Sequence, residues 1–232
     1  MIQIAYTNSN CSDLWEIFQK QTIKHCNIPL YLISDQEPKN FGYTDSYIYN
    51  NNEPYYKVWI DALKKFNSEY FIYLQEDFFL YDNVNEIKLN EYLKFIKLNK
   101  EYSFVRLIKS GNLKNKKIKD TLYEIESTNQ NIFSMQSTIW RTEDYIKLLE
   151  YVKDSKWFEN ENYGKASINL NIKGLYHYND EPKRGGSHYD TDVYPYIATA
   201  LVKGKWNLNE YKNELTTILD NYKIKIEERG IY

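Results

Sequence analysis

The hydrophobic pattern of the first half of the chain alternates between short continuous apolar runs and helical spacing. Continuous runs of this length are typical of strands buried in a sheet, and they occupy residues 2–6, 30–34, 46–49 and 70–74. Between them, apolar residues recur at helical spacing from Leu14 to Thr22 and from Tyr55 to Phe66. This alternation predicts an α/β fold with a central mixed, mainly parallel sheet flanked by helices.

The second half carries weaker patterns of the same two kinds. Apolar spacing predicts helices around 89–96, 143–153, 159–170 and 208–222. Strands or extended segments are expected at 103–108, 132–141, 175–178 and 196–203, and a loop or irregular hairpin at 111–131. Because no repeat or linker divides the chain, we expect a single domain over residues 1–232.

Composition and charge exclude several classes of function. The 232 residues carry a net charge of −2, which rules out a general electrostatic grip on nucleic acid, and we interpret the lysines of 109–119 as a solvated loop. No apolar run approaches the roughly 18 residues of a membrane span, and the first residues lack the pattern of a secretory signal. Cys11 and Cys26 form no metal-binding pair, so we expect free thiols in a cytoplasmic protein.

The first candidate for chemistry is an acidic pair that follows the apolar run at 70–74. Gln75-Glu76-Asp77 comes directly after this run, and ligands of open α/β sheets bind at the carboxyl ends of strands. Two neighbouring carboxylates at such a place can hold a divalent cation, which can in turn bridge to a diphosphate. An ordinary acidic turn has the same sequence, so the segment alone leaves both interpretations open.

The second candidate is the segment Lys183-Arg184-Gly185-Gly186-Ser187-His188-Tyr189-Asp190. Its glycines allow the backbone to approach a phosphate closely, and Lys183 and Arg184 carry charges suited to diphosphate oxygens. His188 is suited to complete a metal shell, and Tyr189 offers a ring that can stack on a sugar. A flexible, solvated loop is the alternative interpretation.

Other candidates stand near the ends of predicted elements. Glu159 and Glu161 lie at the start of a predicted helix, where the helix dipole favours carboxylates. Next to Trp157, such a carboxylate can have a tuned pKa and act as a general base, although first-turn acids also occur for structural reasons alone. Asp35, which follows the second strand, is suited to a nucleotide base or ribose or to shaping a turn, and Thr7 follows the first strand.

Several segments, taken in chain order, resemble the GT-A-fold glycosyltransferases of bacterial and large-virus surface-glycan clusters. An aromatic helix followed by Tyr-Leu-Gln-Glu-Asp-Phe-Phe-Leu (73–80) is the first of them. Ser-Met-Gln-Ser-Thr-Ile-Trp-Arg (134–141), followed by Trp157-Phe158-Glu159, is similar to the middle of the family. Tyr194-Pro195-Tyr196-Ile197 and Lys203-Gly204-Lys205-Trp206-Asn207 are similar to its C-terminal part, so the resemblance covers about residues 1–210.

This resemblance implies a single GT-A-like (Rossmann-like) domain. It implies transfer of a sugar from a nucleoside-diphosphate-sugar donor to a glycan or other hydroxyl acceptor, with Mn²⁺ or Mg²⁺ as the metal. It also implies a nucleotide-binding half (1–80), an acceptor half with a closing loop (81–210), and a C-terminal helix and tail (208–232). No membrane span is expected. The lack of a basic stripe counts against a nucleic-acid partner, although the lysines of 109–119 leave a DNA acceptor open.

The resemblance also implies roles for particular residues. Gln75-Glu76-Asp77 takes the place of the family's Asp-X-Asp motif, with Asp77 as the metal-binding acid and a Gln where the family has its first Asp. This departure leaves fewer protein charges for the metal, so strict metal dependence is open. His188 matches the late metal-binding histidine, with His177 as second choice. Glu159 is the expected base of an inverting reaction, with Glu161 as second choice and a retaining outcome still open. The donor-binding candidates are Thr7, Asp35, Glu76, Lys183, Arg184, Gly185 and Gly186, and the acceptor-binding candidates are Trp157 and Tyr189.

Two other classes of function compete with this interpretation. A sugar-phosphate nucleotidyltransferase also uses an α/β sheet with metal-binding acids, but it usually has a Gly-rich basic loop near the first strand. The corresponding stretch here, Thr-Asn-Ser-Asn-Cys-Ser (7–12), contains no Gly, Lys or Arg. A non-catalytic glycan-binding module would not need the acidic pair, the basic loop and the helix-start acid together. The sequence therefore favours a glycosyltransferase.

Overall fold

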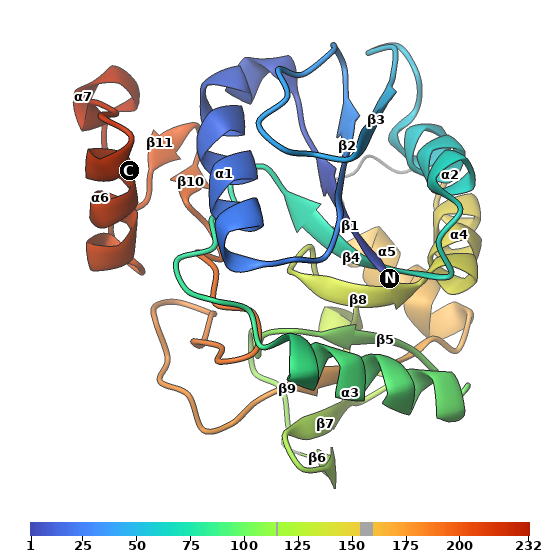
Figure 1. Cartoon of the computed structure of the whole chain (residues 1–232). Helices are drawn as coiled ribbons and strands as arrows, with labels where there is room; N and C mark the ends of the chain where they lie inside the picture. The colour runs from blue at the N-terminus through green and yellow to red at the C-terminus, as the bar shows by residue number, and fades with distance from the viewer. Residues whose placement is uncertain (115, 154–159) are drawn as a thin grey trace.

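A nine-stranded sheet forms the centre of the structure, a computed structural model that describes residues 1–114, 116–153 and 160–232 (Figure 1). Its strand order is β3-β2-β1-β4-β8-β5-β9-β7-β6. All of these strands run in one direction except β7 and β8, which confirms the predicted α/β fold with a mixed, mainly parallel sheet. The strands are β1 Ile2–Tyr6, β2 Leu30–Ser34, β3 Asp45–Ile48, β4 Tyr70–Gln75, β5 Tyr102–Arg106, β6 Lys116–Lys119, β7 Leu122–Ile125, β8 Thr138–Arg141 and β9 Lys173–His177.

Helices cover both faces of the sheet. Helices α2, α4 and α5 contribute to the hydrophobic cluster on one face, and α1, α3 and α6 to the cluster on the other (Figure 1). The helices are α1 Trp15–His25, α2 Tyr55–Phe66, α3 Glu86–Leu98, α4 Thr142–Tyr151, α5 Asn160–Asn169, α6 Lys212–Asn221 and the short α7 Ile226–Arg229. Two 3₁₀ helices, η1 Ser9–Leu14 and η2 Gln130–Ile132, and a small hairpin of β10 Leu201–Val202 and β11 Lys205–Trp206 complete the elements.

The continuous apolar runs form strands because both faces of the sheet are covered. In β1, Ile4 packs into one cluster and its neighbour Ala5 into the other, and Phe71 and Ile72 of β4 divide in the same way. Helix α2 ends where Asn67 adopts the left-handed conformation with φ 48°, a common way for a helix to stop. None of the helices in the described ranges has the length and apolar character that crossing a bilayer requires.

Two predicted boundaries were wrong. The strand predicted at 132–141 begins only at Thr138, because buried Arg106 holds the chain in another conformation there. Its guanidinium donates to the carbonyl oxygens of Asn131 (2.8 Å) and Ile132 (3.1 Å). The last helix was predicted from residue 208 but begins at Lys212, because the side chain of Asn207 accepts a hydrogen bond from the backbone N of residue 209 and forms a local turn.

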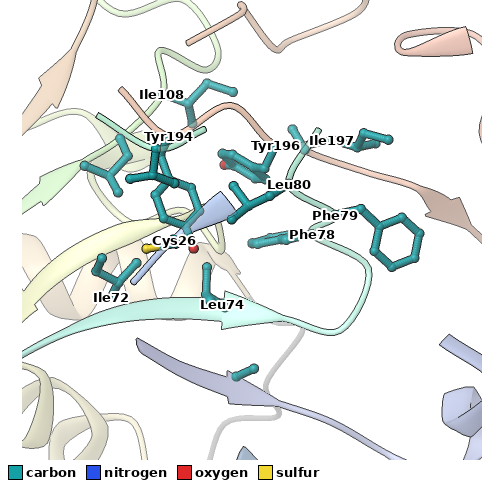
Figure 2. Packing of buried hydrophobic residues seen from close by; sticks show 14 of the residues in the cluster. Cys26, Ile72, Leu74, Phe78, Phe79, Leu80, Ile108, Tyr194, Tyr196 and Ile197 are labelled. Atoms are coloured by element: carbon teal, nitrogen blue, oxygen red, sulfur yellow. The ribbon is translucent and has the colours of Figure 1, made fainter. Parts of the chain in front are cut away.

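The segment that follows β4 is fixed by a distant part of the chain. Leu80 forms an antiparallel bridge with Tyr196, and the backbone N of Ile197 donates to the carbonyl oxygen of Phe79 (2.9 Å). Figure 2 shows Leu80 and Tyr196 together in the hydrophobic core. Because this pairing begins at Phe79, two residues after Asp77, it restricts the backbone that carries that carboxylate.

Substitution of Gly174 by alanine should destabilise the sheet. A Cβ at Gly174 in β9 would lie 1.9 Å from Cζ of Phe104 in β5, so the ring or the backbone must shift. We expect a loss of about 1–3 kcal/mol in the free energy of unfolding, measured by urea denaturation. Gly186→Ala is the matched control, since nothing lies within 4 Å of a Cβ there. Equal urea midpoints for the two variants would contradict this account.

Candidate active site

The carboxyl ends of β1 and β4 open into a cavity of about 500 Å³, within the usual range for small-molecule sites. Most of its wall comes from three parts of the chain that are far apart in sequence, and Tyr55 and Met135 add to it. The three parts are the end of β1 with the loop after it, the acidic segment after β4, and the β10–β11 hairpin. The lining residues include Tyr6, Cys11, Glu76, Asp77, Leu201 and Gly204.

Asp77 lies where the sequence predicted a ligand site, at the carboxyl end of a central strand. Its Oδ2 accepts a hydrogen bond from the backbone N of Leu201 (3.5 Å), and the side chain lines the cavity. Burial raises the pKa of Asp77 to about 6, because the ionised form loses hydration that its hydrogen bonds from backbone N–H groups do not replace. A bound cation would restore the lost stabilisation of the charge.

Glu76 connects the loop after β1 to the end of β4. One of its oxygens, Oε2, accepts hydrogen bonds from the backbone N of Asn8 and from Nε1 of Trp15, both at 2.9 Å. Burial raises the pKa of Glu76 to about 7 in spite of these donors. Glu76 therefore organises the cavity wall, and both carboxylates of the pair face the same space.

Asp35 and Thr7 support the cavity from behind. Asp35 accepts hydrogen bonds from the backbone N (2.7 Å) and hydroxyl (2.6 Å) of Ser9, which fixes the start of η1. The hydroxyl of Thr7 is buried and donates to the carbonyl oxygen of Ile33 (3.1 Å). Neither residue is among those that line the cavity, so their donor-binding roles stay predictions.

The basic segment is a compact hairpin. Lys183 forms an antiparallel backbone β-bridge with Tyr189, and the backbone N of Arg184 donates to the carbonyl oxygen of His188 (2.9 Å). The guanidinium of Arg184 pairs with Glu214 and lies 4.7 Å from the ring centroid of Tyr211. Arg184 would have to leave this partner to reach a diphosphate.

The first glycine of the Gly-Gly pair packs closely against another carboxylate. A Cβ at Gly185 would lie 2.4 Å from Cγ of Glu210, whereas the space beside Gly186 is open. Glu210 accepts a hydrogen bond from Nδ1 of His188 (2.9 Å), and this bond lowers the pKa of Glu210. The first glycine is therefore explained by packing, which the sequence interpretation did not anticipate.

A chain of polar side chains leads from His188 toward Asp77. His188 donates from Nδ1 to Glu210, and its Nε2 accepts a hydrogen bond from the amide Nε2 of Gln136 (3.2 Å). Oε1 of Gln136 accepts in turn from the hydroxyl of Tyr196 (2.7 Å), and the charge of Asp77 raises the pKa of Tyr196 in addition to burial. The sequence interpretation missed Gln136, Tyr196 and Glu210 as parts of this network, although the first two lie in segments that carried the resemblance.

The remaining predicted residues have different positions. Trp157 and Glu159 lie outside the described residues. Glu161 lies in α5, where the structure describes its backbone. The catalytic and acceptor roles of all three residues stay predictions. The ring of Tyr189 lies 5.4 Å from that of Tyr178, edge-on. His177, the second choice for a metal ligand, contacts Glu181 and Asp192 at the end of β9.

The donor set at the cavity fits a hard divalent cation. Glu76 and Asp77 offer carboxylate oxygens, the ligands preferred by Mg²⁺ and Mn²⁺. None of the described residues that line the cavity is Lys or Arg. A phosphate bound here would therefore depend on the cation for neutralisation.

Comparison with known proteins places the fold. No protein-family model and no curated protein matches the chain. The crystal structure of S. aureus TarS 1-349 matches with a TM-score of 0.51 and 14% identity, covering 99% of this chain and 68% of that chain. The longer structure of TarS gives 0.52 and 14% over 99% of this chain and 41% of that one.

A weaker match is a cytidylyltransferase from Leptospira borgpetersenii, with a TM-score of 0.47 and 13% identity over 100% of this chain and 98% of that one. A score this low has no weight for function. The likeness to TarS, at 14% identity, shows that this chain has the same type of α/β fold.

Proposed function

We propose that the protein is a metal-dependent glycosyltransferase that uses a nucleoside-diphosphate-sugar donor. The observation that supports it most is the cavity at the carboxyl ends of β1 and β4, lined by the adjacent carboxylates of Glu76 and Asp77. The type of fold is shared with TarS, whose 1-349 fragment was solved in complex with UDP. Mn²⁺ or Mg²⁺ held by Asp77 would supply the positive charge that a departing diphosphate requires.

The proposed reaction breaks the bond between the anomeric carbon of the sugar and the diphosphate oxygen. The acceptor hydroxyl oxygen forms the new bond to that carbon, and Glu159 takes the hydroxyl proton, which makes the reaction inverting. Asp77 orients the donor, and Glu76 keeps the loop after β1 against the end of β4. The acceptor is a glycan or another hydroxyl compound, with Trp157 and Tyr189 as its proposed contacts.

Product analysis tests this proposal. The protein is incubated with Mn²⁺ and a panel of nucleotide sugars, beginning with uridine diphosphate sugars, and release of nucleoside diphosphate is followed. Release that is lost in Asp77→Asn supports the proposal. Release of pyrophosphate from a nucleoside triphosphate and a sugar phosphate would instead identify a nucleotidyltransferase. No turnover, with glycan binding unaltered in Asp77→Ala, would identify a binding module.

Metal binding at the cavity should weaken in acid. A carboxyl must lose its proton to bind a cation, and the pKa of Asp77 is raised to about 6. The ionised fraction falls roughly tenfold between pH 7 and pH 5, so the Kd for Mn²⁺ in the presence of UDP should rise by about the same factor. Calorimetric titration at the two pH values measures this. A Kd that changes less than about twofold would exclude Asp77 as the titrating ligand.

A further inference from the structure

A second group of ligand-type side chains lies at the carboxyl end of β9, outside the cavity lining. His177 is the last residue of β9 and is fully buried. Its Nε2 lies 2.6 Å from Oε1 of Glu181 and 2.9 Å from Oδ1 of Asp192. These three atoms all lie within 4.8 Å of one another, so one ion can contact all of them.

Each member of the group is oriented by a partner outside it. Nδ1 of His177 lies 2.7 Å from the hydroxyl of Tyr92, which lies 2.6 Å from Oγ1 of Thr121. Tyr92 can therefore accept a hydrogen bond from Nδ1 and donate one to Thr121, so that Nε2 is the nitrogen that can exchange the proton it shares with the two carboxylates for an ion. Metal-binding histidines are typically fixed in this way through their other nitrogen.

Asn179 orients the two carboxylates. Its backbone N donates to Oε2 of Glu181 (2.5 Å), and its side-chain Nδ2 donates to Oδ2 of Asp192 (2.8 Å). The remaining oxygen of each carboxylate is the one that faces His177. The side chain of Asp192 is about half exposed, so the group is open to solvent on that side.

We propose that His177, Glu181 and Asp192 form a binding site for a divalent transition-metal ion, with Zn²⁺ as the probe. One imidazole nitrogen and two carboxylate oxygens are ligands that zinc accepts, at metal–ligand distances of about 2.0–2.2 Å. Separating the three atoms enough to admit an ion requires movements of less than about 1 Å, judged from those distances. The fourth position faces solvent beside Asp192 and takes water.

Such an ion would fasten the hairpin of 183–189 to the sheet. Glu181 precedes this hairpin in the chain and Asp192 follows it, whereas His177 belongs to β9. The ion would thus link the two ends of the segment that carries His188 to each other and to β9. This site is independent of the proposed donor site, because none of its three ligands lines the cavity.

Zinc binding to the whole chain tests the proposal. Protein freed of metal with a chelator is titrated with Zn²⁺ alone, and bound zinc and Tm are measured. The Asp77→Asn variant, which lacks the proposed donor-site ligand, should still bind one zinc ion with a raised Tm. Asp192→Asn should weaken zinc binding at least about tenfold in that background, and His177→Gln should do the same.

Asp180→Asn is the matched control, since Asp180 is an exposed neighbouring carboxylate outside the group, and it should bind zinc as tightly as its parent. Asp192→Asn keeps the size of a half-exposed side chain and an oxygen that can accept hydrogen bonds, so this variant should fold. It therefore tests the zinc site even if His177→Gln does not fold. The proposal is overturned if the Asp77→Asn protein binds no zinc at roughly 100 μM, or if Asp192→Asn binds it equally well. Either result would mean that His177, Glu181 and Asp192 are held together by a proton on Nε2 of His177 and not by a metal ion.

Discussion

Replacing Asp77 with asparagine should lower the rate of nucleoside-diphosphate release by about 100-fold or more while the protein stays folded. The carboxylate faces the cavity and accepts a long hydrogen bond from the backbone N of Leu201, which an amide oxygen can still accept. The variant removes the negative charge that a cation needs. Because burial already disfavours the ionised form of Asp77, the neutral side chain should not reduce stability.

Glu76→Gln is the matched comparison for this result. Its amide oxygen can still accept from Asn8 and Trp15, so the cavity wall should persist and the loss of activity should be smaller. Turnover is measured at saturating donor and Mn²⁺, and folding by circular dichroism. Wild-type turnover in Asp77→Asn would contradict a mechanism in which Asp77 holds the metal. Equal losses of turnover in both variants would indicate that Glu76 and Asp77 bind the metal together.

Replacing Trp59 with alanine should lower the free energy of unfolding by about 3–5 kcal/mol, a large part of the stability of a typical domain. Trp59 of α2 is fully buried, and its ring contacts those of Phe71, Tyr73 and Tyr145 at centroid distances of 5.2–5.9 Å. Its Nε1 has no hydrogen-bond partner among the described residues, so the loss comes from packing.

The same substitution should weaken UDP binding. Trp59 stacks at 6.3 Å on Tyr6, whose ring lines the cavity, so a void at Trp59 loosens one wall of the site. Unfolding is followed in urea by circular dichroism, with Trp59→Phe as the milder control. A stability loss below about 1 kcal/mol would show that the neighbouring rings close the void.

The elements that the sequence predicted well are those with a local cause. The run from Leu30 to Ser34 forms β2 with the predicted bounds, because its residues are apolar on both faces of a covered sheet. Helix α2 likewise follows its apolar spacing from Tyr55 to Phe66. The strand predicted at 132–141 failed because its first residues are held by Arg106, which lies about 25 positions earlier in the chain.

The candidate site shows the same division between local and distant causes. Glu76 and Asp77 could be placed at the cavity from sequence, because a strand followed by acids is a local pattern with a known geometry. Leu201 and Gly204, which complete the wall, come from a hairpin that no local pattern linked to β4. Gly185 was interpreted as a phosphate-binding residue, but its position against Glu210 depends on tertiary contact.

The pairing of Leu80 with Tyr196 has a consequence for the order of events during synthesis. β1, β2 and β4 are translated long before Leu201 and Gly204, so the cavity at the ends of β1 and β4 lacks one wall until this hairpin has followed. A nascent chain that ends before residue 195 lacks both that wall and the strand partner of 79–81. Donor binding should therefore begin late in translation, after most of the sheet has already formed.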